Sequence, residues 1–365
     1  MTGKAQLKMA LRSEQRLALF GRLRMAEWIE MPEREFARQI ERIESDPLFK
    51  KLSLGTGAEA GIIRRQRWPN GQFSSGFYEM NEKVLAGGER VKVEELLGED
   101  AALIPKIRKM GPEAFERYFL YAEEALPIGE IARRTGLTLK QAERVNGLLL
   151  KVGAQAEFAP RRGPQPRGSY ACLARLSVDG SEPGFEFFSP YWARGLYQIR
   201  YDLLEKWKDE GRLPGGELKR LPHLLKKLET INLRQNTVFR ILESLAKLQA
   251  RYLRSRREDF KLPLSLRMLA HRLDLAPSTV SRAVSGRSVR LPWDKETPLI
   301  SLMPGRRRVL KEVLSRWLAE DARRTDAHFV EKLKAEYGIR ISRRTVNSVR
   351  NELGGGRQAQ GEVHA

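Results

Sequence analysis

Apolar residues recur at three- and four-residue intervals through most of this 365-residue chain, which is the pattern of amphipathic helices. The first stretch covers residues 5–50, with a break at Met31-Pro32 and an end at Asp46-Pro47, because proline disfavours helix at the residue before it. Helical spacing resumes near Val93 and continues past Val152, and it returns from Pro222 to Arg257. The sequence therefore predicts a mainly helical, elongated protein of several domains.

Two stretches depart from this spacing. Seven glycines between Leu54 and Gly88 leave residues 51–92 with little periodicity, which is typical of a flexible linker. Residues 172–178 alternate between apolar and polar side chains before the turn Asp179-Gly180 and the aromatic run 185–188. That alternation predicts one small β-hairpin within the helical chain.

Three pairs of predicted helices have the spacing of a helix-turn-helix motif. The pair at Ile128–Val152 is better explained as a hairpin packed in a bundle, because three leucines would bury several faces of its second helix. The pair at Leu264–Gly286 has an apolar stripe on each helix, and Pro277 stands where a helix start accepts proline. In the pair at Asp326–Leu353, Ser342 can cap the second helix.

The second helices of the last two pairs would present hydroxyl, amide and guanidinium groups opposite their apolar stripes. These groups reach phosphates and base edges in DNA, although a merely solvated helix face would carry them too. Arg343 and Arg344 also oppose the helix macrodipole, so a bound polyanion is the simpler reason for them. We expect DNA contacts from Ser278, Thr279, Ser281, Arg282, Arg287, Arg290, Ser342, Arg343, Arg344, Thr345, Asn347, Ser348 and Arg350.

Charge favours the same partner and composition excludes others. The net charge is +21, and residues 251–360 hold 25 Lys and Arg against 12 Asp and Glu, so +13 of it lies in that part. Cys172 is the only cysteine and four histidines are scattered, so we expect no disulfide, metal or other cofactor. No apolar run is long enough for a membrane span, and a reducing cytoplasm fits best.

Three segments together resemble the bacterial RNA polymerase sigma-54 factor family over most of the chain. Residues 342–351 look like the family's signature box, Ala-Arg-Arg-Thr-Val-Ala-Lys-Tyr-Arg-Glu, with Ser348 and Val349 where the family has Lys and Tyr. Residues 278–283 are similar to the Ser-Thr-Val-Ser-Arg-Ala string of its other helix-turn-helix. Residues 44–48 look like the Glu-Ser-Asn-Pro-Leu end of its activator-responsive region.

The resemblance implies a domain order along the chain. It predicts an activator-responsive helical region at 1–50, the linker at 51–92, a helical domain that binds core RNA polymerase at 93–260, a helix-turn-helix domain at 261–303, a signature-box DNA-binding domain at 304–353 and a disordered tail at 354–365. By analogy, polymerase would contact Arg133, Arg134, Lys140 and Arg144, and the activator-responsive residues would be Leu17, Phe20, Leu23, Ile40, Leu48 and Phe49.

The function implied is that of a transcription initiation factor without enzymatic activity. It would bind core RNA polymerase, direct it to double-stranded promoter DNA with GG and GC elements, and hold a closed complex until an ATP-hydrolysing AAA+ activator remodels it. Two other functions stay open at this point. One is a helix-turn-helix repressor or replication initiator that acts without polymerase, and the other is a recombinase or transposase, for which no carboxylate cluster is evident.

Overall fold

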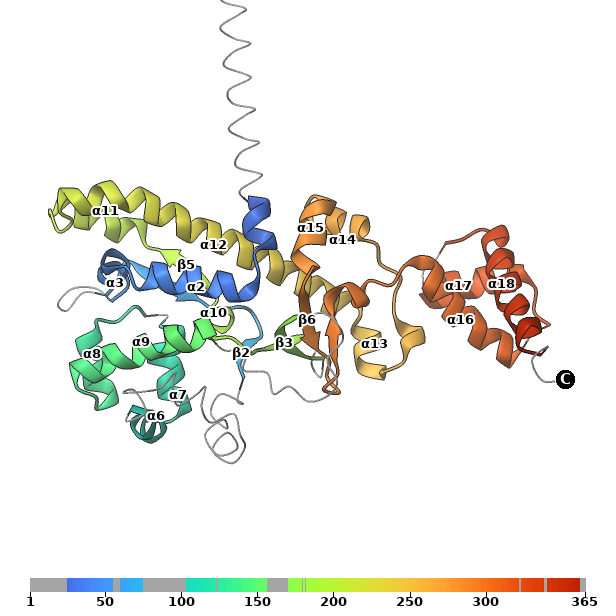
Figure 1. Cartoon of the computed structure of the whole chain (residues 1–365), viewed down its shortest axis with the longest axis horizontal. Helices are drawn as coiled ribbons and strands as arrows, with labels where there is room; N and C mark the ends of the chain where they lie inside the picture. The colour runs from blue at the N-terminus through green and yellow to red at the C-terminus, as the bar shows by residue number, and fades with distance from the viewer. Residues whose placement is uncertain are drawn as a thin grey trace, which may run out of the picture.

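The computed structural model describes residues 25–54, 60–74, 103–122, 124–155, 170–178, 180, 182–321, 323–337 and 340–361. The chain is mainly helical, as the spacing of its apolar residues predicts. Figure 1 shows an elongated molecule, with a large helical body at one end and a smaller unit of α16, α17 and α18 at the other. No helix in the described ranges is long and apolar enough to span a membrane.

The N-terminal helices belong to the body. Residues 25–30 are helical, α2 spans Glu33–Glu44 and α3 spans Pro47–Leu54. The break at Met31-Pro32 is confirmed, but Asp46-Pro47 does not end the helical region: the Asp46 carboxylate accepts the Leu48 N–H at 2.9 Å at the start of α3. Proline is tolerated there because the first helical N–H has no partner within the helix. Leu17, Phe20 and Leu23 lie outside the described residues.

Part of the predicted linker forms two strands, each of which pairs with a strand from later in the chain. Strand β1 (Ile63–Gln66) pairs antiparallel with β5 (Leu196–Ile199), and β2 (Gly71–Phe73) pairs parallel with β4 (Gly184–Phe187). The prediction of a flexible linker is therefore wrong for residues 60–74. Between the strands, the Trp68 ring stacks on Phe239 with centroids 4.2 Å apart, so buried aromatic surface offsets the glycine-rich composition.

The region after the second gap is helical, as predicted. Its helices are α6 (Ile104–Met110), α7 (Pro112–Phe115), the π-helix η3 (Glu116–Tyr121), α8 (Ile128–Thr135) and α9 (Leu139–Gln155). The pair α8 and α9 packs into the main core through its apolar stripe, as the bundle interpretation requires.

The predicted hairpin exists within a larger sheet. Strands β3 (Ala171–Ser177) and β4 pair antiparallel, and the sheet has the order β2-β4-β3-β6-β7, with β6 at Arg287–Arg290 and β7 at Glu296–Pro298. Strand β6 pairs parallel with β3. The sheet thus joins segments that are distant along the chain, and it seats the strand that follows α15 in the protein core.

The longest element is α12 (Gly215–Leu248), which follows α10 (Pro190–Ala193) and α11 (Tyr201–Asp209) and precedes α13 (Ala250–Ser255) and the short helix η4 (Glu258–Phe260). The sequence predicts that this helix starts at Pro222, but α12 begins seven residues earlier, at Gly215. Proline removes the N–H that would bond to Leu218, and Leu218 is 38% exposed, so water can reach the carbonyl there.

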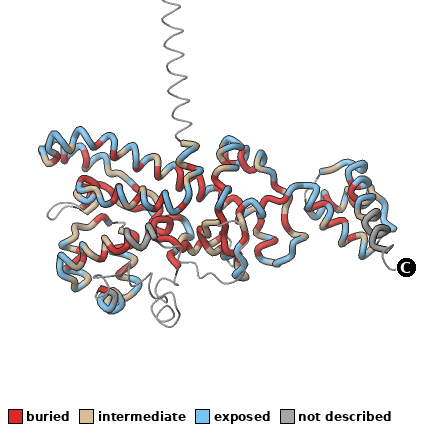
Figure 2. The backbone as a smooth tube through the Cα atoms, in the orientation of Figure 1, coloured by how far each residue is buried: buried red, intermediate tan, exposed pale blue. Residues whose placement is uncertain are grey.

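The remaining helices form two further groups: α14 (Leu266–Leu273) and α15 (Pro277–Val284), and then α16 (Arg306–Glu320), α17 (Asp326–Tyr337) and α18 (Arg343–Gly361), with the turn η5 (Leu299–Leu302) between them. Helix α18 runs into the stretch predicted as a disordered tail. Figure 2 shows buried residues along the body and a separate buried patch in the α16–α18 unit. This second core contains Val309, Val313, Phe329, Leu333, Val346 and Val349.

Candidate nucleic-acid interface

The pair α14 and α15 folds from local signals in its sequence. Ser265 caps α14, since its Oγ accepts the Met268 N–H at 3.1 Å. Asp274 adopts φ 54° in the tight turn, and Pro277 occupies the first position of α15. The apolar stripes of both helices are buried, and Val280 is fully enclosed. Because the apolar face of α15 is buried, its polar face points to solvent.

The outward face of α15 is small and polar. Ser278 and Ser281 are exposed, while Thr279 and Arg282 are half-buried. The Arg282 guanidinium lies 3.5 Å from the Glu30 carboxylate. The two serines are therefore available to a ligand as they stand, and Arg282 would exchange an acidic partner for a phosphate.

Arg287 and Arg290, which we predicted as DNA contacts, lie inside the protein. Arg287 is 2% exposed and Arg290 4% exposed, because the whole of β6 is buried within the sheet. Arg287 donates to the Ala283 carbonyl at 2.7 Å, and Arg290 lies 3.4 Å from the Asp294 carboxylate. Neither guanidinium can reach a DNA phosphate, so both predictions are corrected.

The pair α17 and α18 places its cations outside. The Ser342 Oγ accepts the Thr345 N–H at 3.2 Å, which confirms the predicted cap. Val346 and Val349 are buried, so the opposite face of α18 points to solvent. That face includes the exposed side chains of Arg343, Arg344, Thr345, Asn347 and Ser348.

Arg350 faces inward from this helix. Its Nη1 donates to Asp326 Oδ1 at 3.0 Å and to the Arg324 carbonyl at 3.1 Å, and Asn347 Nδ2 donates to the other Asp326 oxygen at 3.0 Å. The hydrogen bond from Asn347, and then the bond and charge of Arg350, lower the pKa of Asp326. Arg350 thus joins α18 to the start of α17. Its side chain is half-buried, so its role as a DNA contact stays a prediction beside this role within the fold.

Three further cations lie on the same unit and were missed in the sequence. Arg306, Arg307 and Arg308 open α16 and are all exposed. Like Arg343 and Arg344, they oppose the helix macrodipole. Acidic residues counter two of them: Arg307 contacts Glu352, and Arg308 Nε lies 3.2 Å from the Glu312 carboxylate. The run of three arginines after Gly305 was the signal that could have identified them.

A buried carboxylate fastens the N-terminal region behind α15. Glu33 on α2 accepts Arg287 Nε at 2.6 Å, Arg234 Nη2 at 2.9 Å, Trp192 Nε1 at 3.0 Å and the Tyr191 hydroxyl at 3.1 Å. Burial alone would raise the pKa of Glu33, but the charges of Arg234 and Arg287 outweigh that effect and hold the pKa below its usual 4.5. The ionised carboxylate therefore joins α2, α12 and β6.

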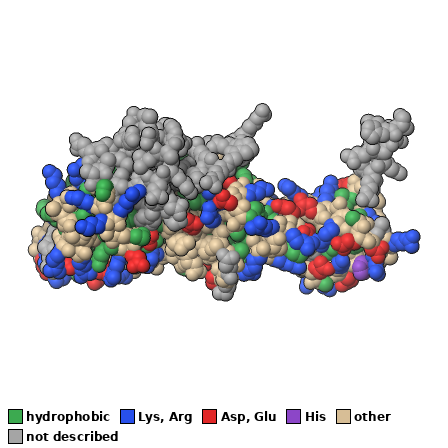
Figure 3. All heavy atoms as spheres, turned by 90° about the horizontal axis from the view of Figure 1, so that it is seen from below, with side chains coloured by type: hydrophobic (Ala, Val, Ile, Leu, Met, Phe, Trp, Pro, Cys, Tyr) green, Lys and Arg blue, Asp and Glu red, His purple; other side chains and the backbone are tan. Residues whose placement is uncertain are grey.

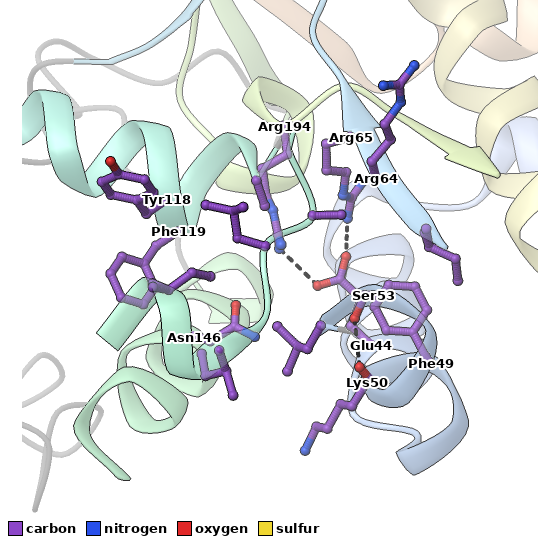
Figure 4. A pocket seen from close by; sticks show the side chains of 17 residues that line it. Glu44, Phe49, Lys50, Ser53, Arg64, Arg65, Tyr118, Phe119, Asn146 and Arg194 are labelled. Atoms are coloured by element: carbon purple, nitrogen blue, oxygen red, sulfur yellow. Dashed lines mark hydrogen bonds and ion pairs between the residues drawn. The ribbon is translucent and has the colours of Figure 1, made fainter. Parts of the chain in front are cut away.

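A second buried carboxylate lies three turns along the same helix. Glu44 accepts the Tyr197 hydroxyl at 2.6 Å and Arg194 Nη1 at 2.9 Å, and it contacts Arg65 of β1. Figure 4 shows Arg65 and Arg194 both directed at this carboxylate, beside a pocket that Phe49 also lines. Burial would raise the pKa of Glu44, but the charges of Arg194 and Arg65 again give a net lowering.

The predicted activator-responsive residues that can be placed are core residues. Ile40 is 3% exposed, Leu48 2% and Phe49 6%. Phe49 packs edge-on against Tyr197 with centroids 5.7 Å apart. They cannot contact an activator directly, and we correct their role to packing. The periodic spacing that suggested a responsive surface was the spacing of an inward face.

The cations predicted to contact polymerase lie on α8 and α9. Arg133, Arg134 and Lys140 are exposed, and Arg144 is half-buried. Arg133 and Arg134 both pair with the Glu130 carboxylate, at 2.6 Å and 2.7 Å. The four lie on one hairpin, as the sequence predicts, but two share an acidic partner.

Charge over the rest of the surface is mixed. Figure 3, which views the molecule from below, shows Lys and Arg side chains interspersed with Asp and Glu on the α16–α18 end and on the opposite end. The part of the chain that the structure describes contains no group of acidic, His and Cys side chains that could hold a metal ion. A general positive field favours polyanions, whereas α15 and α18 carry the groups suited to specific contacts.

Comparisons with known proteins bear on this region. Residues 218–297 match the family described as "Sigma-54, DNA binding domain". This range contains most of α12 and all of α14 and α15, and it ends before α16. No curated protein sequence matches the chain.

Among solved structures, one similar chain is the Aquifex aeolicus sigmaN bound to promoter DNA. It is 19% identical, the likeness covers 88% of this chain and 96% of that chain, and the TM-score is 0.34.

Proposed function

We propose that this chain is a sigma-54-type transcription initiation factor, and not an enzyme, that directs core RNA polymerase to promoters with GG and GC elements. The match of residues 218–297 to the sigma-54 DNA-binding domain supports the proposal. The observation that carries the proposal is that α14 and α15 lie inside the matched range and present Ser278 and Ser281 to solvent. Short hydroxyl side chains of this kind contact base edges and phosphates in the major groove.

We assign the upstream GG element to α18, which lies outside the matched range. Arg343 and Arg344 are exposed at its first turn, the part of a recognition helix that lies deepest in the groove. A guanidinium that reaches guanine O6 and N7 contributes about 1–3 kcal/mol of discrimination. The α14–α15 pair would then lie at the downstream GC element.

The N-terminal region would hold the promoter closed until an AAA+ activator remodels the complex. Its support is physical contact: Glu30 pairs with Arg282 on the outward side of α15, and Glu33 holds Arg287 directly behind that helix. Displacing the start of α2 would therefore disturb α15. Because Ile40, Leu48 and Phe49 are core residues, an activator would act on some other part of the N-terminal region.

Binding of core polymerase separates this proposal from a repressor or replication initiator. The full-length chain should co-purify with core RNA polymerase in the absence of DNA, and a repressor should not. A charge-reversed variant, Arg133→Glu with Lys140→Glu, should lose that association if the α8–α9 hairpin is the contact. The matched control is Lys206→Glu with Lys208→Glu, two exposed cations on α11, outside that hairpin.

Footprinting tests the promoter assignment. The polymerase complex should protect a DNA fragment that carries GG and GC elements and leave a scrambled fragment unprotected. The variant Arg343→Ala with Arg344→Ala should keep polymerase and lose protection at the GG side. Co-purification failure, or equal protection of both fragments, would refute the proposal.

A further inference from the structure

A short structured joint connects the body to the α16–α18 unit. We propose that this joint, made of Asp259 and Phe260 of η4 with Arg251, Arg257 and Arg316 around them, sets the separation and rotation of α15 and α18 and thereby selects the spacing of the two promoter elements. The inference rests on the proposed function, because it concerns how two DNA elements are read together.

Phe260 belongs to both cores. Its partly buried ring packs against the main core and also against the core of the α16–α18 unit. The guanidinium of Arg251 lies over the ring at 3.9 Å from the centroid, and that of Arg257 lies at 4.6 Å. Cations in such positions are attracted by the face of an aromatic ring. Moving either unit away from this ring would therefore expose apolar surface that is now in contact.

Ionic contacts cross the same junction. The Asp259 carboxylate pairs with Arg257 at 3.0 Å and contacts Arg316 of α16. The side chains of Asp259 and Arg316 are only 15% and 26% exposed, so water and salt screen this contact less than a surface pair. Arg251 Nη1 also donates to the Glu336 carbonyl at the end of α17, at 3.3 Å.

The body side of the joint is fixed as well. The Gln249 side chain, fully buried at the end of α12, accepts the Leu262 N–H at 2.9 Å and donates to the Leu262 and Leu302 carbonyls at 2.9 Å each. Lys261 is buried and pairs with Glu258 at 2.5 Å. The chain on either side of Phe260 is thus tied to the helical body, and little slack remains between the two units.

A stiff joint between two DNA-binding units makes binding depend on the spacer length between their DNA elements. Each added base pair moves one element about 3.4 Å along the axis and about a tenth of a turn around it. A loose tether would follow both movements at little cost, whereas a packed joint must break the contacts of Phe260 or Arg316. The joint therefore penalises every spacer length except the one that matches its geometry.

The test is a binding series with full-length protein and short duplexes. The duplexes carry a GG and a GC element, and their spacers cover every length across one helical turn, about 10 base pairs. Fluorescence anisotropy gives the affinity for each length. The wild-type chain should show one sharp optimum. In Phe260→Ala and in Arg316→Ala, the ratio of affinity at the optimum to affinity one base pair away should fall about fivefold, as expected for a coupling between neighbouring groups.

The control is Arg308→Ala, which removes the same charge from α16 but whose side chain pairs with Glu312 on its own helix at 3.2 Å. It should lower affinity at all lengths and keep the optimum sharp. Asp259→Asn, which keeps the size of the side chain, serves if Phe260→Ala does not fold. A wild-type optimum that persists unchanged in every joint variant overturns this inference alone. A wild-type chain that does not prefer any two-element duplex to scrambled DNA overturns the proposed function together with it.

Discussion

At the scale of single residues, Glu33 is the group on which two buried arginines depend. Arg234 is fully buried and Arg287 is 2% exposed, and both donate to the same carboxylate oxygen. Their charges are compensated inside the protein only while this carboxylate is present and ionised. Removing one partner of a buried ion pair destabilises a protein far more than replacing the whole pair by apolar residues.

We therefore expect Glu33→Gln to destabilise the fold by about 3–5 kcal/mol, because it leaves two buried cations without a negative partner. Urea unfolding at neutral pH measures the difference. The matched control is Glu35→Gln, an exposed glutamate in the same first turn of α2, which should change stability little. Equal losses in the two variants would contradict the role given to Glu33.

Acid should weaken the same contacts. The pKa values of Glu33 and Glu44 in the folded chain lie below the usual 4.5, so their stabilisation is complete above that pH and is lost as the pH falls through the lower, folded values. Urea unfolding from pH 7 downwards should show stability declining below about 4.5. Glu33→Gln with Glu44→Gln should flatten that decline. A double variant that loses stability as steeply as wild type would exclude these two groups as the cause.

Arg344 is the residue-scale test of DNA reading. It is exposed on the first turn of α18, so Arg344→Ala should weaken binding of a GG-containing duplex by about 1–3 kcal/mol and leave the melting temperature unchanged. Binding to a duplex with a scrambled GG element should change much less. Lys334→Ala, which removes an exposed cation from α17, is the control for charge alone. An identical loss on both duplexes would mean that Arg344 contacts only phosphate.

At the scale of elements, the end of β1 and the residue before β5 lie so close together that only glycine fits between them. Gly195 has φ +70°, and a Cβ there would overlap the Gln66 carbonyl oxygen at the end of β1. Gly195→Ala should therefore cost more than about 1 kcal/mol, through both strain and overlap. Thermal unfolding measures the loss. Gly216→Ala on α12 meets open space and should be neutral or stabilising.

Periodicity predicted the helices well because each helix carries its own stripe. The stripes of α14, α15, α17 and α18, the caps at Ser265 and Ser342 and the start at Pro277 were all readable locally. The strands β1 and β2 were not, because their partners lie more than a hundred residues away and their glycines resemble those of a linker. Arg287 failed as a predicted DNA contact for the same reason, since its carboxylate is on α2.

At the scale of the whole molecule, the N-terminal region divides into two parts with different expected effects. Residues 25–50 contribute Glu33, Glu44 and buried apolar side chains to the main core, so a chain lacking residues 1–50 should unfold at a markedly lower temperature. A chain lacking only residues 1–24 keeps these contacts. It is therefore the appropriate chain for testing whether the extreme N-terminus restrains initiation.

In vitro transcription with polymerase provides that test. If residues 1–24 help to keep the promoter closed, the shorter deletion should melt like wild type and initiate without an activator. The larger deletion serves as the comparison for damage to the fold. Strict dependence on the activator in a normally folded chain lacking residues 1–24 would assign the restraint to residues after position 24.

Helix α12 has a mechanical consequence. With 34 residues it is roughly 50 Å long, since each residue adds about 1.5 Å. Near its start, Glu217 pairs with Lys51 of α3 at 2.7 Å, and further along Arg240 donates to the Leu273 carbonyl of α14 at 2.8 Å. A displacement of α3 would tilt α12 as a rigid rod and so tilt the α14–α15 turn. The helix is continuous between the two contacts, so no loop there absorbs the movement.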